Sequence, residues 1–341
     1  MTDLPASLGM SLPMVAAPMA GGPSTPELVI AAADAGGLGF LAAGYKTPGQ
    51  LADQIAAVRA ATSRFGVNLF VPNTVAMTHR DFTTYRATIS SCSHQFDVNL
   101  PTEPFDDDDA WDAKVDLLAS DPVPVVSFTF GFPSPDVIRR FQSVGSTTVQ
   151  TVTSVDEATQ AHGLGMDALV VQAAAAGGHS ATTTPHTPVQ DLPLPDLVRT
   201  VAAAVDLPIF AAGGISNCEQ IREVRAAGAV AAVVGTALLR ATEAGTSAPH
   251  RAALADPTRV ETVVTRAFSG RPARAIRNEF TDRFTGYAPL GFPAVHHLTA
   301  PLRKAATAAG NPEFVNLWAG TGFRHTPEQP AAMILRTLGD F

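Results

Sequence analysis

The chain has 341 residues, of which 46% are hydrophobic and 16% charged, with a formal net charge of −8 and a pI of about 5.5. This composition supplies a large core and excludes a disordered chain, and the acidic balance argues against nucleic-acid or membrane partners. The two cysteines, Cys92 and Cys218, lie in no metal-ligand motif, so we expect neither a metal site nor a disulfide framework. We expect a cytoplasmic protein, because no signal-peptide pattern is seen and no apolar run reaches the ~20 residues of a membrane span.

The first half of the chain alternates short apolar runs with helical stretches. Strands are predicted at 13–18, 38–42, 65–70, 123–129 and 147–152, and helices at 26–35, 47–61, 75–90, 107–119, 135–142 and 155–161. Ser24 or Thr25 can cap the first helix, whose initial turn holds Pro26 and Glu27, where these residue types are favoured. The acidic run at 106–109 is predicted to be a solvated helix N-terminus.

The second half continues this alternation. Strands are predicted at 168–171, 208–212 and 229–234, with helices at 197–205 and 217–227 between them. The strands are apolar throughout, which is typical of strands buried on both faces of a parallel sheet. Eight such units favour a (β/α)8 TIM barrel over an open sheet. The absence of GxGxxG after the first strand disfavours a dinucleotide-binding fold.

After residue 240 the strand–helix alternation ends. The stretch 259–284 is mixed, and 301–341 is helical in pieces, with a glycine-rich break at 319–322. We therefore predict a barrel at 1–240 and a mostly helical appendage at 241–341 that packs on the barrel and covers one end of it.

The stretch 167–181, DALVVQAAAAGGHSA, is the first candidate for a binding site. A strand ending at Gln172 runs into small residues, then Gly177, Gly178 and His179. Backbone without bulky side chains lets a large flat ligand approach closely, and the histidine could reach the reactive edge of that ligand. The alternative is an Ala/Gly loop with a solvated histidine.

Two glycine turns further along form a second candidate. IFAAGGIS ends a strand at Gly213 and Gly214, and VVGTAL does so at Gly235 and Thr236. In barrels, the loops after the last two strands commonly bind phosphate through backbone N–H groups at helix N-termini. The alternative is two ordinary turns. Their position at the end of an eight-unit pattern favours the phosphate site.

A phosphate site next to an Ala/Gly strip predicts a phosphorylated flat cofactor, and FMN fits. Its ring would lie beside Met19, Ala20, Asn68 and Gln172 at the carboxyl ends of the strands. The two amides could bond the polar edge of the ring, although each could equally be a buried amide satisfied by backbone.

With these motifs in place, the chain resembles the nitronate monooxygenases, formerly called 2-nitropropane dioxygenases, and their bacterial class I branch in particular. The similarity covers most of the length. It consists of APMAGG (17–22), LAAGYKTP (41–48), GVNLF (66–70), AGGH (176–179), AAGGI (211–215), VGTALL (234–239), FSGRPAR (268–274), RNEF (277–280) and WAGTG (318–322).

The resemblance implies an FMN-binding barrel with an additional substrate-covering part. The implied FMN contacts are Pro18, Met19, Asn68, Gln172, Gly177, Gly213, Gly214, Gly235 and Thr236, with Gly178 beside them and Gly320 and Thr321 closing over the flavin. The histidine of AGGH maps onto His179, the implied catalytic base. Ala173 and Ala175 stand where the family more usually has glycine and glutamate, which removes a possible partner for the base.

The chemistry expected of such a site is oxidation of a nitronate by dioxygen to a carbonyl compound and nitrite. His179 would remove the α-proton of a nitroalkane or bond a nitronate already formed, while FMN takes one electron. No metal or NAD(P)H is required. Tyr45, Lys46, Phe132 and His186 are predicted to contact substrate. Arg271 and Arg274 are expected to pair with acids of the appendage.

Two other functions remain open at this point. A flavin enoyl-ACP reductase would share the barrel and the GGH segment but use NAD(P)H. A non-catalytic flavin binder is the other alternative, since Ala175 removes the possible partner of the base.

Overall fold

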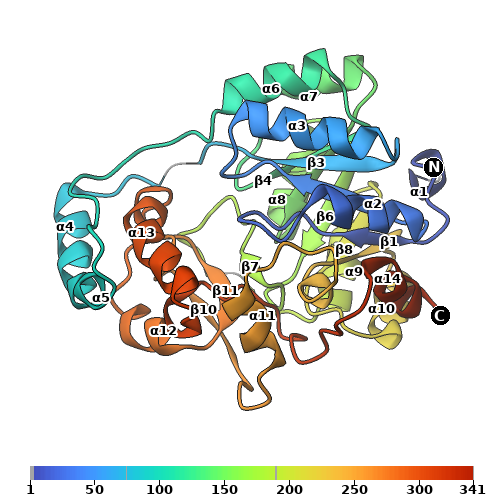
Figure 1. Ribbon diagram of the computed structural model, residues 1–341. Helices are drawn as coiled ribbons and strands as arrows, with labels where there is room; N and C mark the ends of the chain where they lie inside the picture. Colours follow the sequence, from blue (N-terminus) through green and yellow to red (C-terminus); the bar gives the residue numbers. More distant parts are fainter. Residues whose placement is uncertain (1–3, 74, 189, 341) are drawn as a thin grey trace.

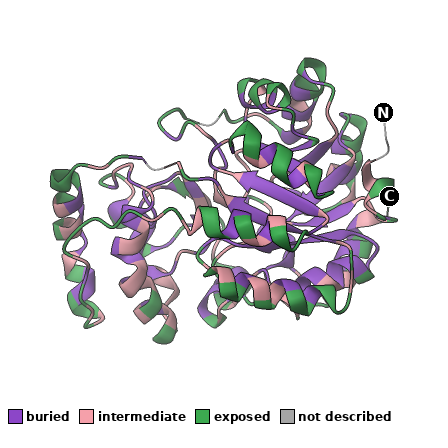
Figure 2. Ribbon diagram, turned by 90° about the horizontal axis from the view of Figure 1, so that it is seen from above, coloured by how far each residue is buried: buried purple, intermediate pink, exposed green. Residues whose placement is uncertain are grey.

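The computed structural model describes residues 4–73, 75–188 and 190–340 and confirms the predicted (β/α)8 barrel. Its eight strands are parallel and close into a ring in which β1 pairs with both β2 and β9 (Figure 1). They are β1 Met14–Ala16, β2 Leu38–Ala42, β3 Phe65–Phe70, β4 Val125–Thr129, β5 Thr147–Val152, β6 Ala168–Gln172, β8 Ile209–Ala212 and β9 Ala231–Val234. Figure 2 shows these strands as the buried centre of the molecule, as the apolar runs predicted.

Alternate side chains of a barrel strand face opposite sides. In β3, Val67 and Leu69 belong to the core between strands and helices, whereas Asn68 between them lines an interior cavity. Val15 and Phe210 belong to a separate apolar cluster formed by other strand residues. The strands thus present an apolar outer face and a more polar inner face near their carboxyl ends.

The helices that alternate with the strands around the barrel are α2 Pro26–Asp34, α3 Pro48–Arg59, α6 Trp111–Ser120, α7 Pro135–Ser143, α8 Val155–Gly163, α9 Leu194–Ala204 and α10 Cys218–Ala226. Their starts follow local chemistry. Thr25 accepts the N–H of Leu28 at the start of α2, and Thr47 forms a capping box with Gln50 at the start of α3.

The acidic run at 106–109 differs from the prediction. The helix α6 begins at Trp111, after Asp109 and Ala110 adopt left-handed backbone with φ of 59° and 52°. The Asp109 carboxylate lies 2.7 Å from the buried Lys114 ammonium and accepts the N–H of Tyr45 at 2.8 Å. Asp109 is therefore a partner in a buried ion pair and not a solvated helix start.

A second apolar cluster draws on two stretches far apart in the sequence, 82–100 and 239–323, which we call the covering region. The first stretch comprises most of α4 (His79–Thr88) together with α5 (Ser90–Gln95), where a single helix at 75–90 was predicted. Figure 1 shows α4 and α5 beside α13 (Ala294–Ala308), well away from the barrel. The division of the chain at residue 240 stays a prediction.

The rest of the covering region contains helices and a small sheet. The helices are α11 Ala248–Ala255 and α12 Glu279–Phe284, and the antiparallel sheet has the order β10 (Thr262–Thr265), β11 (Ala273–Ile276), β7 (Gly178–His179). The strand β7 comes from the barrel loop after β6, so this sheet joins the two parts of the molecule.

The C-terminal helices differ in extent from the prediction. The helix α13 starts at Ala294, before the range 301–341 that was predicted to be helical in pieces, and runs through Pro301. Its buried residues Leu298 and Leu302 lie on either side of the proline, so packing outweighs the local helix-breaking tendency. The last helix, α14 (Ala331–Gly339), returns to the barrel and packs on α2 and α10. Phe341, in the predicted helical range, lies outside the described residues.

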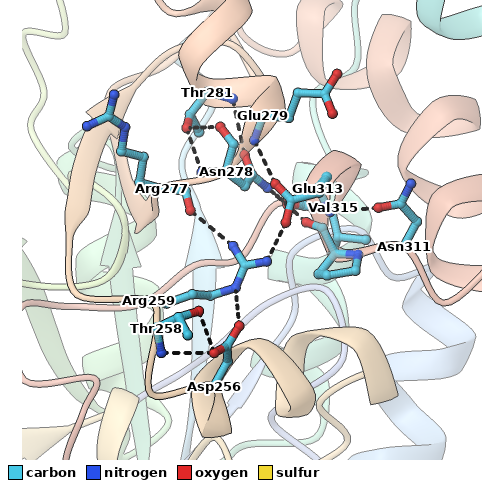
Figure 3. Close-up of polar contacts among 11 residues, drawn as sticks. Asp256, Thr258, Arg259, Arg277, Asn278, Glu279, Thr281, Asn311, Glu313 and Val315 are labelled. Carbon is cyan, nitrogen blue, oxygen red and sulfur yellow. Dashed lines mark hydrogen bonds and ion pairs between the residues drawn. The ribbon is translucent and has the colours of Figure 1, made fainter.

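A polar network fixes the segment that leads from α13 back to the barrel (Figure 3). The Arg259 guanidinium bonds the Glu313 carboxylate and the carbonyl of Arg277. The Asn278 amide donates to the carbonyls of Pro312 and Val315, both at 2.9 Å. The residues that follow, up to 322, are thereby held against the mouth of the barrel.

Candidate active site

A cavity of about 680 Å³ lies at the carboxyl ends of the barrel strands, where the covering region meets them. Its size falls within the roughly 300–1,000 Å³ typical of small-molecule sites. Ala17, Asn68, Thr129, Gln172 and Ala212 line it from the strand ends, and the covering region lines it with α13 and the segment up to residue 322.

Most residues predicted from the sequence line this one cavity. They are Pro18, Met19, Ala20, Tyr45, Asn68, Gln172, Gly177, Gly178, His179, Gly213, Gly214, Gly235, Thr236 and Gly320. Four others are not among its lining residues: Lys46, Phe132, His186 and Thr321. The Lys46 ammonium donates to the carbonyl of Ala42 at 2.7 Å. Phe132 packs against the core between strands and helices, and His186 is exposed.

Two adjacent loops present free backbone amides to the cavity. In the loop after β8, Gly213 and Gly214 have φ of 128° and 74°, which glycine adopts without strain. Among the described residues, the N–H groups of Gly213, Gly214, Ile215, Gly235 and Thr236 have no protein acceptor, and all five residues line the cavity. Converging free amides at the ends of parallel strands suit an anion such as phosphate.

The strip of small residues after β6 does allow a close approach. The main chain at Ala319 and Gly320 lies directly against it. A Cβ on Gly177 would lie 2.4 Å from the backbone nitrogen of Gly320. The N–H of Thr321 donates to the carbonyl of Ala175 at 3.1 Å, and the N–H of Gly320 donates to the Thr236 hydroxyl at 2.9 Å. The strip therefore joins the barrel to the covering region as well as lining the cavity.

The two predicted amides have different surroundings. The Gln172 side chain accepts the N–H of Ala181 at 2.8 Å and donates to the carbonyl of His179 at 3.3 Å, so it orders the loop that carries the histidine. The Asn68 amide donates to the hydroxyls of Ser127 and Thr129, each at 2.9 Å. The Asn68 oxygen has no donor among the described residues.

His179 lies where the two parts of the molecule meet. Its position in β7 pairs it with Ala273 of β11, and its Nε2 lies 2.8 Å from the Ser269 hydroxyl. The rings of Phe130, Phe292 and Trp318 surround the imidazole at 5.3–5.9 Å between centroids. The other ring nitrogen, Nδ1, has no partner among the described residues and is the atom open to a ligand.

The surroundings of His179 favour its neutral form. Burial, followed by the positive charges of Arg271 and Arg303, lowers the pKa of this imidazole to about 3. At neutral pH the ring is therefore an uncharged hydrogen-bonding group, and it accepts a proton only when an anion nearby offsets those charges.

A cluster of polar groups on α13 faces the histidine across the cavity. The His296 ring stacks on Tyr45 with centroids 4.2 Å apart, and the Arg303 guanidinium donates to the His296 carbonyl at 2.9 Å. Tyr45, Arg303 and Asn316 all line the cavity. Tyr45 is thus the one predicted substrate residue that the fold brings to this site.

Among the described residues Arg271 and Arg274 form no ion pair with an acid, contrary to the expectation. The buried Arg271 guanidinium bonds the carbonyls of Ser180, Thr182 and Phe130 and lies 4.1 Å above the Phe130 ring. Arg274 donates to the carbonyl of Ala174 at 2.8 Å. Both arginines satisfy loop carbonyls near the cavity and so fix the backbone on either side of His179.

The threonines after His179 are held by a buried acid on α8. The Glu157 carboxylate accepts the hydroxyls of Thr182 and Thr183 and the N–H of Thr183, and it also accepts the N–H of Thr153 at the end of β5. This contact orders the loop after the histidine. It also gives a structural role to the threonines of this loop, whose acidic partner lies about 25 residues earlier in the chain.

Several cavity residues were not predicted. Trp318 lines the cavity and Ser269 bonds His179 from behind it. Both belong to motifs quoted above, so their motifs were a usable signal. Arg303 and His250 stand in no motif. His250 is buried, and its Nε2 has no partner among the described residues; burial lowers its pKa to about 4 against an opposing bond with the backbone of Trp318.

Within 4–73, 75–188 and 190–340, no group of three or more His, Cys, Asp or Glu side chains could hold a metal ion. In the same residues, no helix combines the length and apolar character needed to cross a membrane.

Comparison with known proteins agrees with this geometry. The nitronate monooxygenase family profile matches residues 6–339. A probable nitronate monooxygenase of Staphylococcus aureus strain Newman is 34% identical over 337 residues, covering 97% of this chain and 94% of that protein. The solved nitroalkane oxidase of Streptomyces ansochromogenes is 42% identical with a TM-score of 0.93, covering 99% of this chain and 97% of that one. FabK of Thermotoga maritima shares the fold, at 24% identity and a TM-score of 0.76.

Fold and site define a (β/α)8 barrel whose cavity lies between the strand ends and a second structural part, and the relatives place it among the oxidoreductases. Within that class, the family match over nearly the whole length is decisive: the chain belongs to the nitronate monooxygenase family.

Proposed function

We propose that this protein is an FMN-dependent oxidase of alkyl nitronates, and of nitroalkanes, that forms a carbonyl compound and nitrite with dioxygen. The observation that carries the proposal is the sharing of one cavity by five free backbone amides and a neutral, enclosed imidazole. The amides of Gly213, Gly214 and Gly235 suit the phosphate of FMN. The ring would extend toward Met19 and His179. The similarity to a nitroalkane oxidase supports the same substrate class.

The fit to FMN rests on the chemistry of the lining. Gly214 leaves room that a Cβ would fill, since that Cβ would lie 3.0 Å from the Ala175 Cβ and the Thr321 hydroxyl. The Thr236 hydroxyl accepts the Gly320 N–H and keeps its own hydrogen for a phosphate oxygen. When bound, FMN supplies an acceptor for one electron from the nitronate, and dioxygen completes the oxidation.

In this proposal the residues of the chain orient the substrate and exclude water. The His179 Nδ1 donates to an oxygen of the nitronate, while the Ser269 hydroxyl holds Nε2 and fixes the tautomer. Because the pKa of His179 is lowered to about 3, the imidazole is better suited to bonding a preformed nitronate than to removing a proton from a neutral nitroalkane. The aromatic rings around it keep the reacting group away from bulk water.

The test is purification followed by two assays. We expect a yellow protein with an FMN spectrum, nitrite release from propyl-2-nitronate in air, and a change of the flavin spectrum to that of the one-electron-reduced form on anaerobic addition of that nitronate. His179→Asn should lower nitrite release by about 100-fold or more while FMN stays bound. His162→Asn, which changes an exposed histidine on α8, is the matched control with parental rate.

The alternatives predict different outcomes. Rapid anaerobic bleaching by NADPH would favour an enoyl-reductase-like enzyme. Unchanged turnover of His179→Asn would contradict the proposed role of the imidazole. Since His179 stays neutral well above its pKa of about 3, oxidation of a preformed nitronate should show no ionisation of this ring between about pH 5 and pH 9.

A further inference from the structure

Arg303 is a half-buried cation on the cavity wall with no counter-charge among the described residues. The side chain lies on α13, lines the cavity, and forms no ion pair with any acid among the described residues. The buried Lys114, by comparison, pairs with Asp109 at 2.7 Å. A buried charge is costly unless it is paired, so an uncompensated guanidinium at a cavity points to an anionic ligand.

The hydrogen bonds of Arg303 leave one donor free. Nε donates to the Thr299 hydroxyl at 3.1 Å and one Nη1 hydrogen to the Asn316 side-chain oxygen at 3.4 Å. Both Nη2 hydrogens are directed to His296, one to the carbonyl at 2.9 Å and one to Nδ1 at 3.3 Å. A guanidinium has five donors, so one Nη1 hydrogen has no protein acceptor among the described residues. All of the partners are neutral.

The neighbours of Arg303 keep it in place. Thr299 donates to the carbonyl of Phe268, which fixes this turn of α13 within the covering region. The His296 ring is held flat against Tyr45. The guanidinium is thus fixed before a ligand arrives, which lowers the entropic cost of binding. It also acts on His179, because its charge is one cause of the lowered imidazole pKa.

We infer that Arg303 binds the anionic oxygens of the substrate, and that it makes the site selective for nitronates over neutral nitroalkanes. This inference rests on the proposed function. A nitronate carries its charge on two coplanar oxygens, which suits a planar guanidinium. Arg303 would hold one oxygen while the Nδ1 of His179 bonds the other. The charge of the bound anion would offset that of Arg303, which a neutral nitroalkane cannot do.

The test measures anion binding apart from turnover. The holoenzyme is titrated with nitrate, a planar oxyanion that the enzyme cannot oxidise, by calorimetry and by the change in flavin absorbance. Arg303→Met should weaken nitrate binding by roughly 30-fold or more, as expected for loss of a charged partner. Arg303→Lys, which keeps the charge but loses the planar group, should weaken it several-fold less. Arg222→Met, on the exposed face of α10, should bind nitrate like the parent.

Steady-state kinetics with a nitronate and with a neutral nitroalkane test the selectivity of Arg303 directly. In Arg303→Met the KM for propyl-2-nitronate should rise at least about tenfold more than the KM for neutral nitroethane. Lys304→Met removes a charge one residue away, at an exposed position of the same wall, and should cause only a small effect that salt abolishes.

Several outcomes would overturn the inference. Parental nitrate affinity in Arg303→Met would do so, as would equal losses for nitronate and nitroethane, or loss of FMN with unchanged nitrate affinity in the flavin-loaded fraction. Should Arg303→Met fail to fold, Arg303→Lys decides, since parental nitrate affinity there contradicts recognition by the planar group. Nitrate binding that depends on Arg303 in a protein without nitronate turnover would contradict the proposed function and leave the anion site standing.

Discussion

The two walls of the cavity are built on different principles. The barrel wall offers mainly backbone, with free amides at Gly213, Gly214 and Gly235. The covering wall offers side chains, among them those of Arg303 and Trp318. Backbone amides recognise a phosphate without regard to the rest of the ligand, whereas charged and aromatic side chains discriminate between substrates. Under the proposed function, cofactor binding and substrate choice are therefore expected to be separable in this chain.

The largest effect should come from disturbing the contact between the walls. Gly177→Val places a side chain against the backbone at Ala319 and Gly320, which cannot move without breaking the junction. We expect the free energy of unfolding to fall by about 3 kcal/mol, measured by urea denaturation.

Gly163→Ala at the end of α8 is the control for this change. A Cβ there meets nothing within 4 Å, so its stability should stay within about 0.5 kcal/mol of the parent. Parental stability in Gly177→Val would show that the two walls are not in firm contact.

A smaller effect is expected from changing the barrel wall alone. Gly214→Val strains a left-handed position and moves a free amide away from the phosphate, so FMN affinity should fall by roughly 10- to 100-fold. Titration of the deflavinated protein with FMN measures this loss.

The matched control for Gly214→Val is Gly145→Val. Gly145 has φ of 88° and open space around it, and it lies outside the cavity lining. That variant should show a similar loss of stability with unchanged FMN affinity. Equal FMN affinity in both variants would contradict the assignment of the phosphate site.

The smallest effect should come from one hydroxyl on the covering wall. Ser269→Ala removes the partner of the His179 Nε2 and should lower the rate of nitronate oxidation by about tenfold, with FMN affinity unchanged. Ser269→Thr should restore most of the rate.

Ser146→Ala is the control for the lost hydroxyl. It removes another buried serine hydroxyl, one that bonds the carbonyl of Val123 outside the cavity, and should leave the rate at the parental level. A tenfold loss in this variant as well would mean that Ser269 acts through stability alone.

The sequence was sufficient for the barrel because most strands are short, largely apolar runs between helices, and the Thr-rich β5 still has the β-branched residues typical of strands. The glycine turns at Gly213 and Gly235 could be predicted as well, because they depend only on the local sequence at the end of a strand and not on a contact with a distant residue. The covering region was harder to predict. Its core combines Phe82 and Tyr85 with residues nearly 200 positions later in the chain. A contact between such distant segments cannot be predicted from a local sequence pattern.

Side-chain roles were predicted less well for the same reason. Lys46 lies next to Tyr45 in a family motif, yet its ammonium turns back to a strand carbonyl. His186 follows a loop that Glu157 holds, and this contact leaves the histidine outside the cavity. Arg303 belongs to no motif, and only the fold of α13 reveals that its charge faces the ligand space.

One short strand has a wider consequence. The residues Gly178 and His179 are paired to β11 on one side, while Gln172 holds the carbonyl of His179 and the N–H of Ala181 on the other. The imidazole is thus fastened to both halves at once. If the halves separate, one set of bonds must break and the ring leaves its place. Under the proposed function, turnover would therefore require the barrel and the covering region to be in contact.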